Sequence, residues 1–165
     1  MRLAALITLV VGLAASATTA MAAGGRSGLL EIVNGRGIVQ ITGKGGLNGR
    51  IVRGSLQITD LSPGDEWSPW INGLPRGKVA SIRGENVLFR LSAGRYQIVA
   101  RGEGISISAR GTGQAILDGE PDAVGATGFY RVGDRPRQAL PASVIRVSFG
   151  GKEPRTSGPS GKIKS

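Results

Sequence analysis

The chain has 165 residues, with 21 Lys and Arg against 11 Asp and Glu, and therefore a formal net charge of +10 at pH 7. It contains no cysteine and no histidine, which excludes disulfides, thiolate chemistry, Cys or His metal sites and Ser-His-Asp catalysis. A chain of this length typically forms one domain. Without disulfides, that domain must derive its stability from the packing of its core.

The N-terminal segment has the pattern of a secretory signal peptide. Arg2 precedes an apolar run from Leu3 to Ala15, and the segment ends in Ala20-Met21-Ala22, the small-x-small pattern that signal peptidase cleaves. The alternative is a retained membrane anchor, but the apolar run is short for a bilayer span of about 20 residues. We therefore expect cleavage after Ala22, a secreted or cell-envelope location and a mature chain without a transmembrane segment. Loss of residues 1–22 removes Arg2 and no acid, which lowers the formal charge from +10 to +9.

Short runs rich in Val, Ile, Leu, Thr and Ser, separated by glycines, indicate an all-β domain. We expect a short linker at residues 23–28, a single β-domain at 29–149 and a disordered basic tail at 150–165. In chain order, the predicted strands are 29–33, 37–42, 50–59, 79–83, 87–91, 96–101, 105–110, 114–118, 128–132 and 143–149.

Turn dipeptides separate these runs. Three of them favour the tight turns of β-hairpins, namely Asn34-Gly35, Asn48-Gly49 and Asp118-Gly119. Asn72-Gly73 is typical of a loop turn. The segment 92–95 predicts a hairpin with Gly94 in the left-handed region, and Gly102-Glu103-Gly104 predicts another.

Polarity alternates along the predicted strands between residues 87 and 110, so that one face is apolar and the other polar. The apolar positions are Val87, Phe89, Leu91, Tyr96, Ile98, Ala100, Ile105, Ile107 and Ala109. The polar positions are Arg90, Gln97, Arg101, Ser106, Ser108 and Arg110. Since no segment after residue 22 has helical periodicity, the apolar face must pack on another sheet. We therefore expect an antiparallel β-sandwich or a closed barrel of about 8–10 short strands.

Two segments of the chain resemble each other. RIVRGSLQIT at 50–59 and QIVARGEGISIS at 97–108 share an Ile-Val, an Arg-Gly and a similar ending. A duplicated hairpin would produce this similarity. Chance would produce it equally well in a chain of such restricted composition, and no prediction rests on it.

The segment 60–78 is a candidate binding loop, because loops of this length in a compact domain are often functional. It holds three acids, Asp60, Asp65 and Glu66, and both tryptophans, Trp67 and Trp70. The acids suggest an oxygen-ligand cation site, and the tryptophans suggest a sugar-stacking platform. The alternative is that the tryptophans cover one end of the domain while the acids are solvated. The acids do not match the spacing of a calcium loop, and we expect no metal and no cofactor.

Arginines provide a second candidate site. Arg83, Arg90, Arg101 and Arg110, with Arg95, lie on or beside adjoining predicted strands, where they would share a solvent face and attract an anionic polymer. We expect envelope polymers, acidic glycans or lipid headgroups rather than nucleic acid, because an exported protein meets the former and few aromatic residues are present to stack on bases. The alternative is a charged face that is simply solvated.

Gly-x-Gly pairs at 102–104 and 111–113 do not form a dinucleotide fingerprint. That fingerprint needs a third glycine three residues on and a helix after it. Ile107 and Ile116 occupy those positions, and strand patterns follow. The glycines therefore indicate turns rather than a phosphate site.

Three stretches carry a resemblance to known proteins: GRIVRGSLQITDLSPGD, then GENVLFRLSAGRYQIVARGEGISISARGTGQAILDG, then TGFYRV. In this order they resemble a group of small, uncharacterised exported β-rich proteins of high-GC Gram-positive bacteria. The resemblance implies a shared β-fold and secretion, and it carries over no activity, ligand or site residue. We expect a non-enzymatic exported β-domain that binds anionic surface polymers. The alternatives are a carbohydrate-binding module that uses Trp67 and Trp70, and an enzyme that uses Asp60, Asp65 or Glu66 as acid and base.

Overall fold

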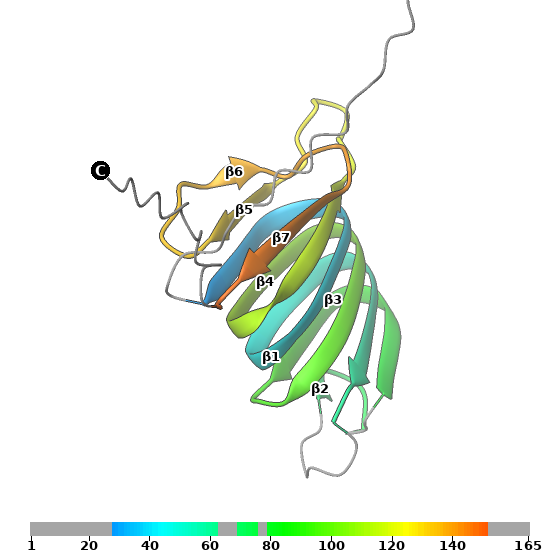
Figure 1. Ribbon diagram of the computed structural model, residues 1–165. Coiled ribbons are helices and arrows are strands. Elements are labelled where there is room, and N and C mark those ends of the chain that lie inside the picture. Colours follow the sequence, from blue (N-terminus) through cyan, green and yellow to red (C-terminus); the bar gives the residue numbers. More distant parts are fainter. Residues whose placement is uncertain (1–27, 63–68, 76–78, 152–165) are drawn as a thin grey trace, which may run out of the picture.

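The computed structural model describes residues 28–62, 69–75 and 79–151. This part of the chain is all-β (Figure 1), with strands β1 (Leu29–Asp60), β2 (Trp70–Ile71), β3 (Val79–Leu91), β4 (Arg95–Gly119), β5 (Phe129–Val132), β6 (Gln138–Ala139) and β7 (Ile145–Phe149). None of the described residues forms a helix that could cross a membrane. The expected signal peptide, nearly all of the linker and most of the tail lie outside the described residues.

The strands form one antiparallel sheet with the order β2-β3-β1-β4-β7, and β5 pairs with both β1 and β6. The prediction of an antiparallel all-β fold is confirmed. The closed barrel is wrong, because β2 and β7 lie at opposite ends of the strand path and do not pair with each other. The expected number of short strands is also wrong, since two long strands, β1 and β4, contain most of the predicted segments.

Strands β1 and β4 pair with each other twice. Ile38 of β1 pairs with Arg101 on one side and with Asp118 on the other, and these two residues of β4 are 17 residues apart. The two strands therefore form an antiparallel ribbon that coils, so that each turn of the ribbon is hydrogen-bonded to the next (Figure 1). Strand β3 continues the sheet beside the second half of β1, and β7 continues it beside the end of β4.

The strands continue through most of the glycines that the sequence suggested as hairpin turns. Asn34-Gly35 and Asn48-Gly49 lie inside β1 and Gly102-Glu103-Gly104 lies inside β4, whereas Asp118-Gly119 ends β4 and a loop follows it, so these four hairpin predictions are wrong. A glycine lets a strand bend while its backbone stays in the hydrogen-bonded ladder. The fifth predicted hairpin is wrong as well: residues 92–94 join β3 to β4, and Gly94 has the expected positive φ, at 101°, but both strands pair with β1 and not with each other. The predicted loop turn at Asn72-Gly73 follows β2.

The predicted strand positions and inward residues are confirmed, although eight of the predicted segments merge into β1, β3 and β4. The nine apolar positions of the predicted alternation are all buried, and their polar neighbours are exposed or half-buried. Buried side chains from β1 to β7 form one apolar cluster. Removal of this apolar surface from water, worth about 25 cal/mol per Å², drives the ribbon to coil around its inward face.

Candidate functional site

Five glycines line up across neighbouring strands and mark one side of the coil. The pairing registers align them in the spatial order Gly84, Gly54, Gly102, Gly37 and Gly119, and we call this set the glycine row. Gly37 and Gly102 have φ angles of 117° and 133°. A Cβ atom at either position would overlap with the backbone of the adjacent strand. The bend at this side of the coil therefore requires glycine.

The alternation of inward and outward side chains changes phase at the glycine row. In β4, the buried residues on either side of the row, Ala100 and Ile105, are five residues apart. In β1, the buried Ile51 and Leu56 have the same odd spacing. In a regular strand, two inward-facing residues are an even number of positions apart. An odd spacing therefore means that two consecutive residues between the buried ones face outward. As a result, Arg53 and the other arginines that precede these glycines are available to line the surface.

On one side of the glycine row, acidic and basic residues alternate across the strands, and we call them the ion-pair ladder. In spatial order they are Glu85, Arg53, Glu103, Arg36 and Glu120. Arg53 Nη1 lies 3.0 Å from Glu103 Oε1, and Arg53 Nε lies 3.3 Å from Glu85 Oε1. Arg36 Nη1 lies 3.6 Å from Glu103 Oε2. Exposed pairs of this kind contribute at most about 1 kcal/mol each, so their main effect is to neutralise these two arginines.

On the other side of the row, Arg83 and Arg101 flank Ser55, which is the register partner of both. Both arginines are exposed, and neither forms an ion pair with a carboxylate among the described residues. Neighbouring strands are about 4.8 Å apart, so the two backbone positions are about 10 Å apart. Two side chains as long as arginine can reach a single group above Ser55. We call Arg83 and Arg101 the arginine pair.

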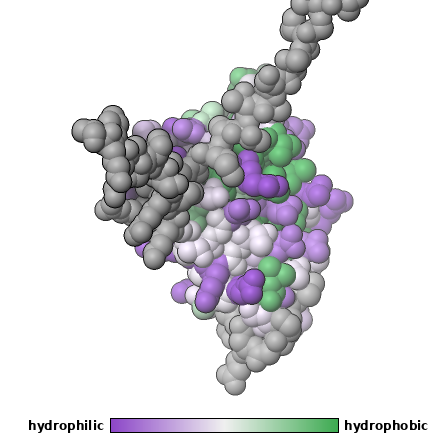
Figure 2. Space-filling model, in the orientation of Figure 1, coloured by the Kyte–Doolittle hydropathy of each residue, from purple (hydrophilic) through white to green (hydrophobic). Residues whose placement is uncertain are grey.

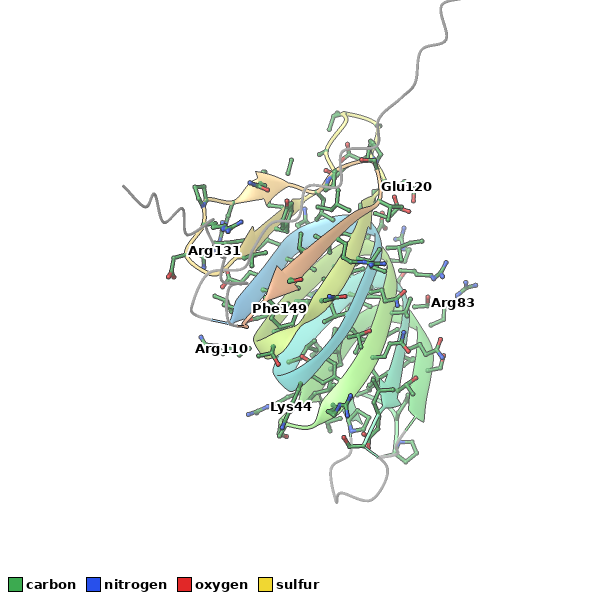
Figure 3. All side chains as sticks on the ribbon, viewed as in Figure 1. Lys44, Arg83, Arg110, Glu120, Arg131 and Phe149 are labelled. Carbon is green, nitrogen blue, oxygen red and sulfur yellow. The ribbon has the colours of Figure 1, made fainter. Side chains whose placement is uncertain are left out.

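The ladder and the arginine pair line an open groove with a volume of about 540 Å³. Gly54, Gly84 and Gly102 form part of its lining, and four arginines outnumber three glutamates in its walls. Figure 3 shows Arg83 and Glu120 on one side of the coil, and Lys44 and Arg110 on the opposite side. Hydrophilic side chains gather along the side that carries Arg83 in Figure 2.

The structure brings together only two of the four arginines that the sequence suggested. Arg83 and Arg101 line the groove. Arg90 pairs in register with Trp70 and Asn48, and Arg110 pairs with Leu29 and Gly46. Both of these positions lie beyond the glycine row, on the other side of the bend. Arg90 and Arg110 therefore do not contribute to the groove.

The candidate loop at 60–78 is only partly described. Trp70 lies in β2 with 43% of its surface exposed, whereas the adjacent Ile71 is 2% exposed, so Ile71 packs on the core in place of Trp70. Asp65, Glu66 and Trp67 lie outside the described residues. No cluster of three potential metal-ligating residues occurs in the described part of the chain.

Asp60 is half-buried at the end of β1, opposite Tyr96. Its Oδ1 accepts a hydrogen bond of 2.8 Å from the backbone N–H of Ser62. Its Oδ2 and the Tyr96 hydroxyl are both buried, and neither has a hydrogen-bond partner among the described residues. Burial raises the pKa of Tyr96 to about 12. These two groups lie inside the coil, away from the groove.

Most of the groove, including Ser55 and the residues of the ladder, is absent from the candidate sites that the sequence suggested. A signal for it exists in the Arg-Gly dipeptides at 36–37, 53–54, 83–84 and 101–102, which all meet at the glycine row. The first two are 17 residues apart, the offset between successive turns of the ribbon, and they begin the similar segments RGIVQIT and RGSLQIT. The similarity between 50–59 and 97–108 also reflects the glycine row, because the Arg-Gly dipeptides of the two segments meet there, with Gly54 and Gly102 as register partners.

In comparisons with known proteins, no protein-family model, no curated protein and no solved structure matches the chain. The resemblance to exported bacterial proteins therefore stays an expectation from the sequence. The functional interpretation depends on the groove and its charges.

Proposed function

We propose that this protein is a non-enzymatic exported domain that binds anionic polymers of the cell envelope or extracellular space through the groove at the glycine row. The arginine pair carries this proposal. Arg83 and Arg101 are exposed guanidinium groups without a carboxylate partner among the described residues, whereas Arg36 and Arg53 beside them are paired. A guanidinium group presents its N–H donors in a planar fork that matches the oxygens of a carboxylate or phosphate.

Two further features support the proposal. The net charge of the mature chain, +9 after loss of residues 1–22, would attract polyanions over distances of about 10 Å at 0.1 M ionic strength. The predicted signal peptide would bring the domain to the surface where such polymers occur. We also propose that the two sides of the coil pack as the layers of a β-sandwich, since Ile51 and Leu56, on either side of the glycine row, belong to the same core cluster. Such packing would hold the groove in a fixed shape.

The test compares two double variants that remove the same charge. Arg83→Gln with Arg101→Gln removes the arginine pair, and Arg90→Gln with Arg110→Gln is the matched control beyond the glycine row. A charge-assisted hydrogen bond is worth about 1.5–3 kcal/mol, and 1.4 kcal/mol is a tenfold change in affinity. We expect the first variant to bind polygalacturonate or dextran sulfate at least tenfold more weakly, as measured by calorimetry at low salt. An equal loss of affinity in both variants would mean that binding depends on net charge alone, and it would contradict the proposal that the groove is the binding site.

A second candidate function is supported by Trp70. Its ring is 43% exposed, and its register partner is Arg90. An exposed aromatic ring beside a hydrogen-bond donor is a typical platform for a sugar ring. If this surface binds neutral glycans, their addition will change the tryptophan fluorescence, and Trp70→Ala will abolish that change. An unchanged spectrum across a panel of neutral glycans would remove this candidate.

A further inference from the structure

We infer that the groove recognises an acidic glycan, meaning a polymer whose repeating unit carries a carboxylate beside free hydroxyl groups. This inference rests on the proposed function and goes beyond it, because it names the class of polymer. It follows from the juxtaposition of unpaired guanidinium donors on one wall with carboxylate acceptors on the other.

The donor wall matches a carboxylate. Arg83 and Arg101 lie on the two strands that flank Ser55, so two guanidinium groups and one hydroxyl converge on the same region. Carboxylates accept such donors in a planar, bidentate geometry. One carboxylate between the two arginines would neutralise the uncompensated charge of this wall.

The acceptor wall matches hydroxyl groups. An ionised carboxylate has about four lone-pair sites, and ion pairs use only part of this capacity at Glu85 and Glu103. Glu120 is exposed and forms no ion pair within the described part of the chain. The free oxygens of these side chains can accept hydrogen bonds from the hydroxyl groups of a sugar.

The same wall disfavours a phosphate polymer. Polyphosphate and DNA chains offer oxygen acceptors and negative charge, and no hydroxyl donors along the backbone. In this groove they would lie against three carboxylates, Glu85, Glu103 and Glu120, and like charges at close range are unfavourable. The groove lining also contains no aromatic residue on which a base could stack. The groove therefore selects against polyphosphates and nucleic acids and in favour of a ligand that has both donors and acceptors.

The length of the groove favours a polymer over a single sugar. The lining runs across the strands from Arg83 and Glu85 in β3 to Glu120 after β4. Five aligned strand positions span about 19 Å at a spacing of about 4.8 Å. The glycines between the walls leave the backbone without side chains, so a chain lying along the row could contact both walls at successive units.

The experiment measures the affinity of the full-length protein for polygalacturonate, for inorganic polyphosphate and for dextran, at equal charge concentration and equal ionic strength. We expect polygalacturonate to bind at least tenfold more tightly than polyphosphate, and dextran not to bind. Glu120→Ala removes one acceptor and one negative charge, and it should weaken polygalacturonate binding about threefold while it strengthens polyphosphate binding. Net charge alone would strengthen both. Asp134→Ala, at an exposed acid outside the groove, is the control and should leave the ratio of the two affinities unchanged.

The outcomes separate this inference from the proposed function. If polyphosphate binds as tightly as polygalacturonate, and Arg83→Gln with Arg101→Gln abolishes both, the groove binds anions but the acidic-glycan inference is wrong. If Glu120→Ala strengthens both interactions, the acceptor wall has no role in recognition and the inference is again wrong. If neither polyanion binds, or if the arginine-pair variant binds both like the native protein, the proposed function fails together with the inference.

Discussion

The glycine row leads to a prediction about stability: alanine will be tolerated at one end of the row and not in its middle. At Gly102, φ is 133°, a conformation that costs an L-residue about 1–3 kcal/mol. A Cβ atom there would also overlap with the carbonyl oxygen of Arg53 and would lie 2.7 Å from the Cα of Gly54. These are backbone atoms of a paired strand, so relief requires the ladder itself to shift, and overpacking of this kind typically costs about 1–3 kcal/mol. We expect Gly102→Ala to lower the free energy of unfolding by about 2–6 kcal/mol.

Gly84→Ala is the matched control, because Gly84 is aligned in the same row on β3. A Cβ atom at Gly84 would meet no atom within 4 Å, and its φ is not positive. Alanine there restricts the unfolded chain and should stabilise the protein by up to about 1 kcal/mol. Urea denaturation followed by circular dichroism gives both values. If Gly102→Ala costs no more than Gly84→Ala, the row is not a bend that requires glycine, and the geometric basis of the groove is refuted.

Three further predictions follow from hydrogen bonding and burial. Tyr96→Phe removes a buried hydroxyl that has no hydrogen-bond partner in the described part of the chain, and it should raise the free energy of unfolding, measured in urea, by about 1 kcal/mol. Burial raises the pKa of Tyr96 from 10.0 to about 12, so ionisation of this tyrosine costs no stability below pH 10 and favours the unfolded chain as the pH rises towards 12. Thermal melts between pH 10 and 12 should therefore show a steeper loss of stability for the native protein than for Tyr96→Phe. The backbone N–H groups of Ala126 and Val124 donate hydrogen bonds of 2.8 and 3.0 Å to Asp122 Oδ1, and these bonds, Ala126 first, hold the pKa of this carboxyl below its ordinary value. The 122–126 turn should therefore stay ordered above the ordinary pKa and lose its order as the pH falls through the lowered pKa. An NMR titration that finds an ordinary or raised pKa for Asp122 would contradict these contacts.

Local sequence properties determined which chemistry this protein cannot perform, where most of its strands lie and which residues are buried. The absence of cysteine and histidine excluded whole classes of chemistry, because those side chains supply the nucleophiles, bases and ligands concerned. The alternation of apolar and polar residues located the strands and assigned residues such as Phe89 and Ile107 to the core, since successive side chains of a strand point to opposite faces. The positive φ of Gly94 was also predictable, because it depends on a few consecutive residues.

Only the tertiary structure decided whether a glycine ends a strand or bends it. Gly94 and Gly102 both have positive φ angles, yet Gly94 lies in the connection between β3 and β4 and Gly102 lies inside β4. The difference depends on which strand lies alongside: Gly102 is flanked on both sides by β1, at Gly54 and at Gly37, and these pairings keep its neighbours in the ladder. Such pairings join residues far apart in the chain through the offset between turns of the ribbon, which no local pattern reports. The same long-range registers bring Arg83, Arg101 and the ion-pair ladder together, and for that reason the groove emerged from the structure rather than from the sequence.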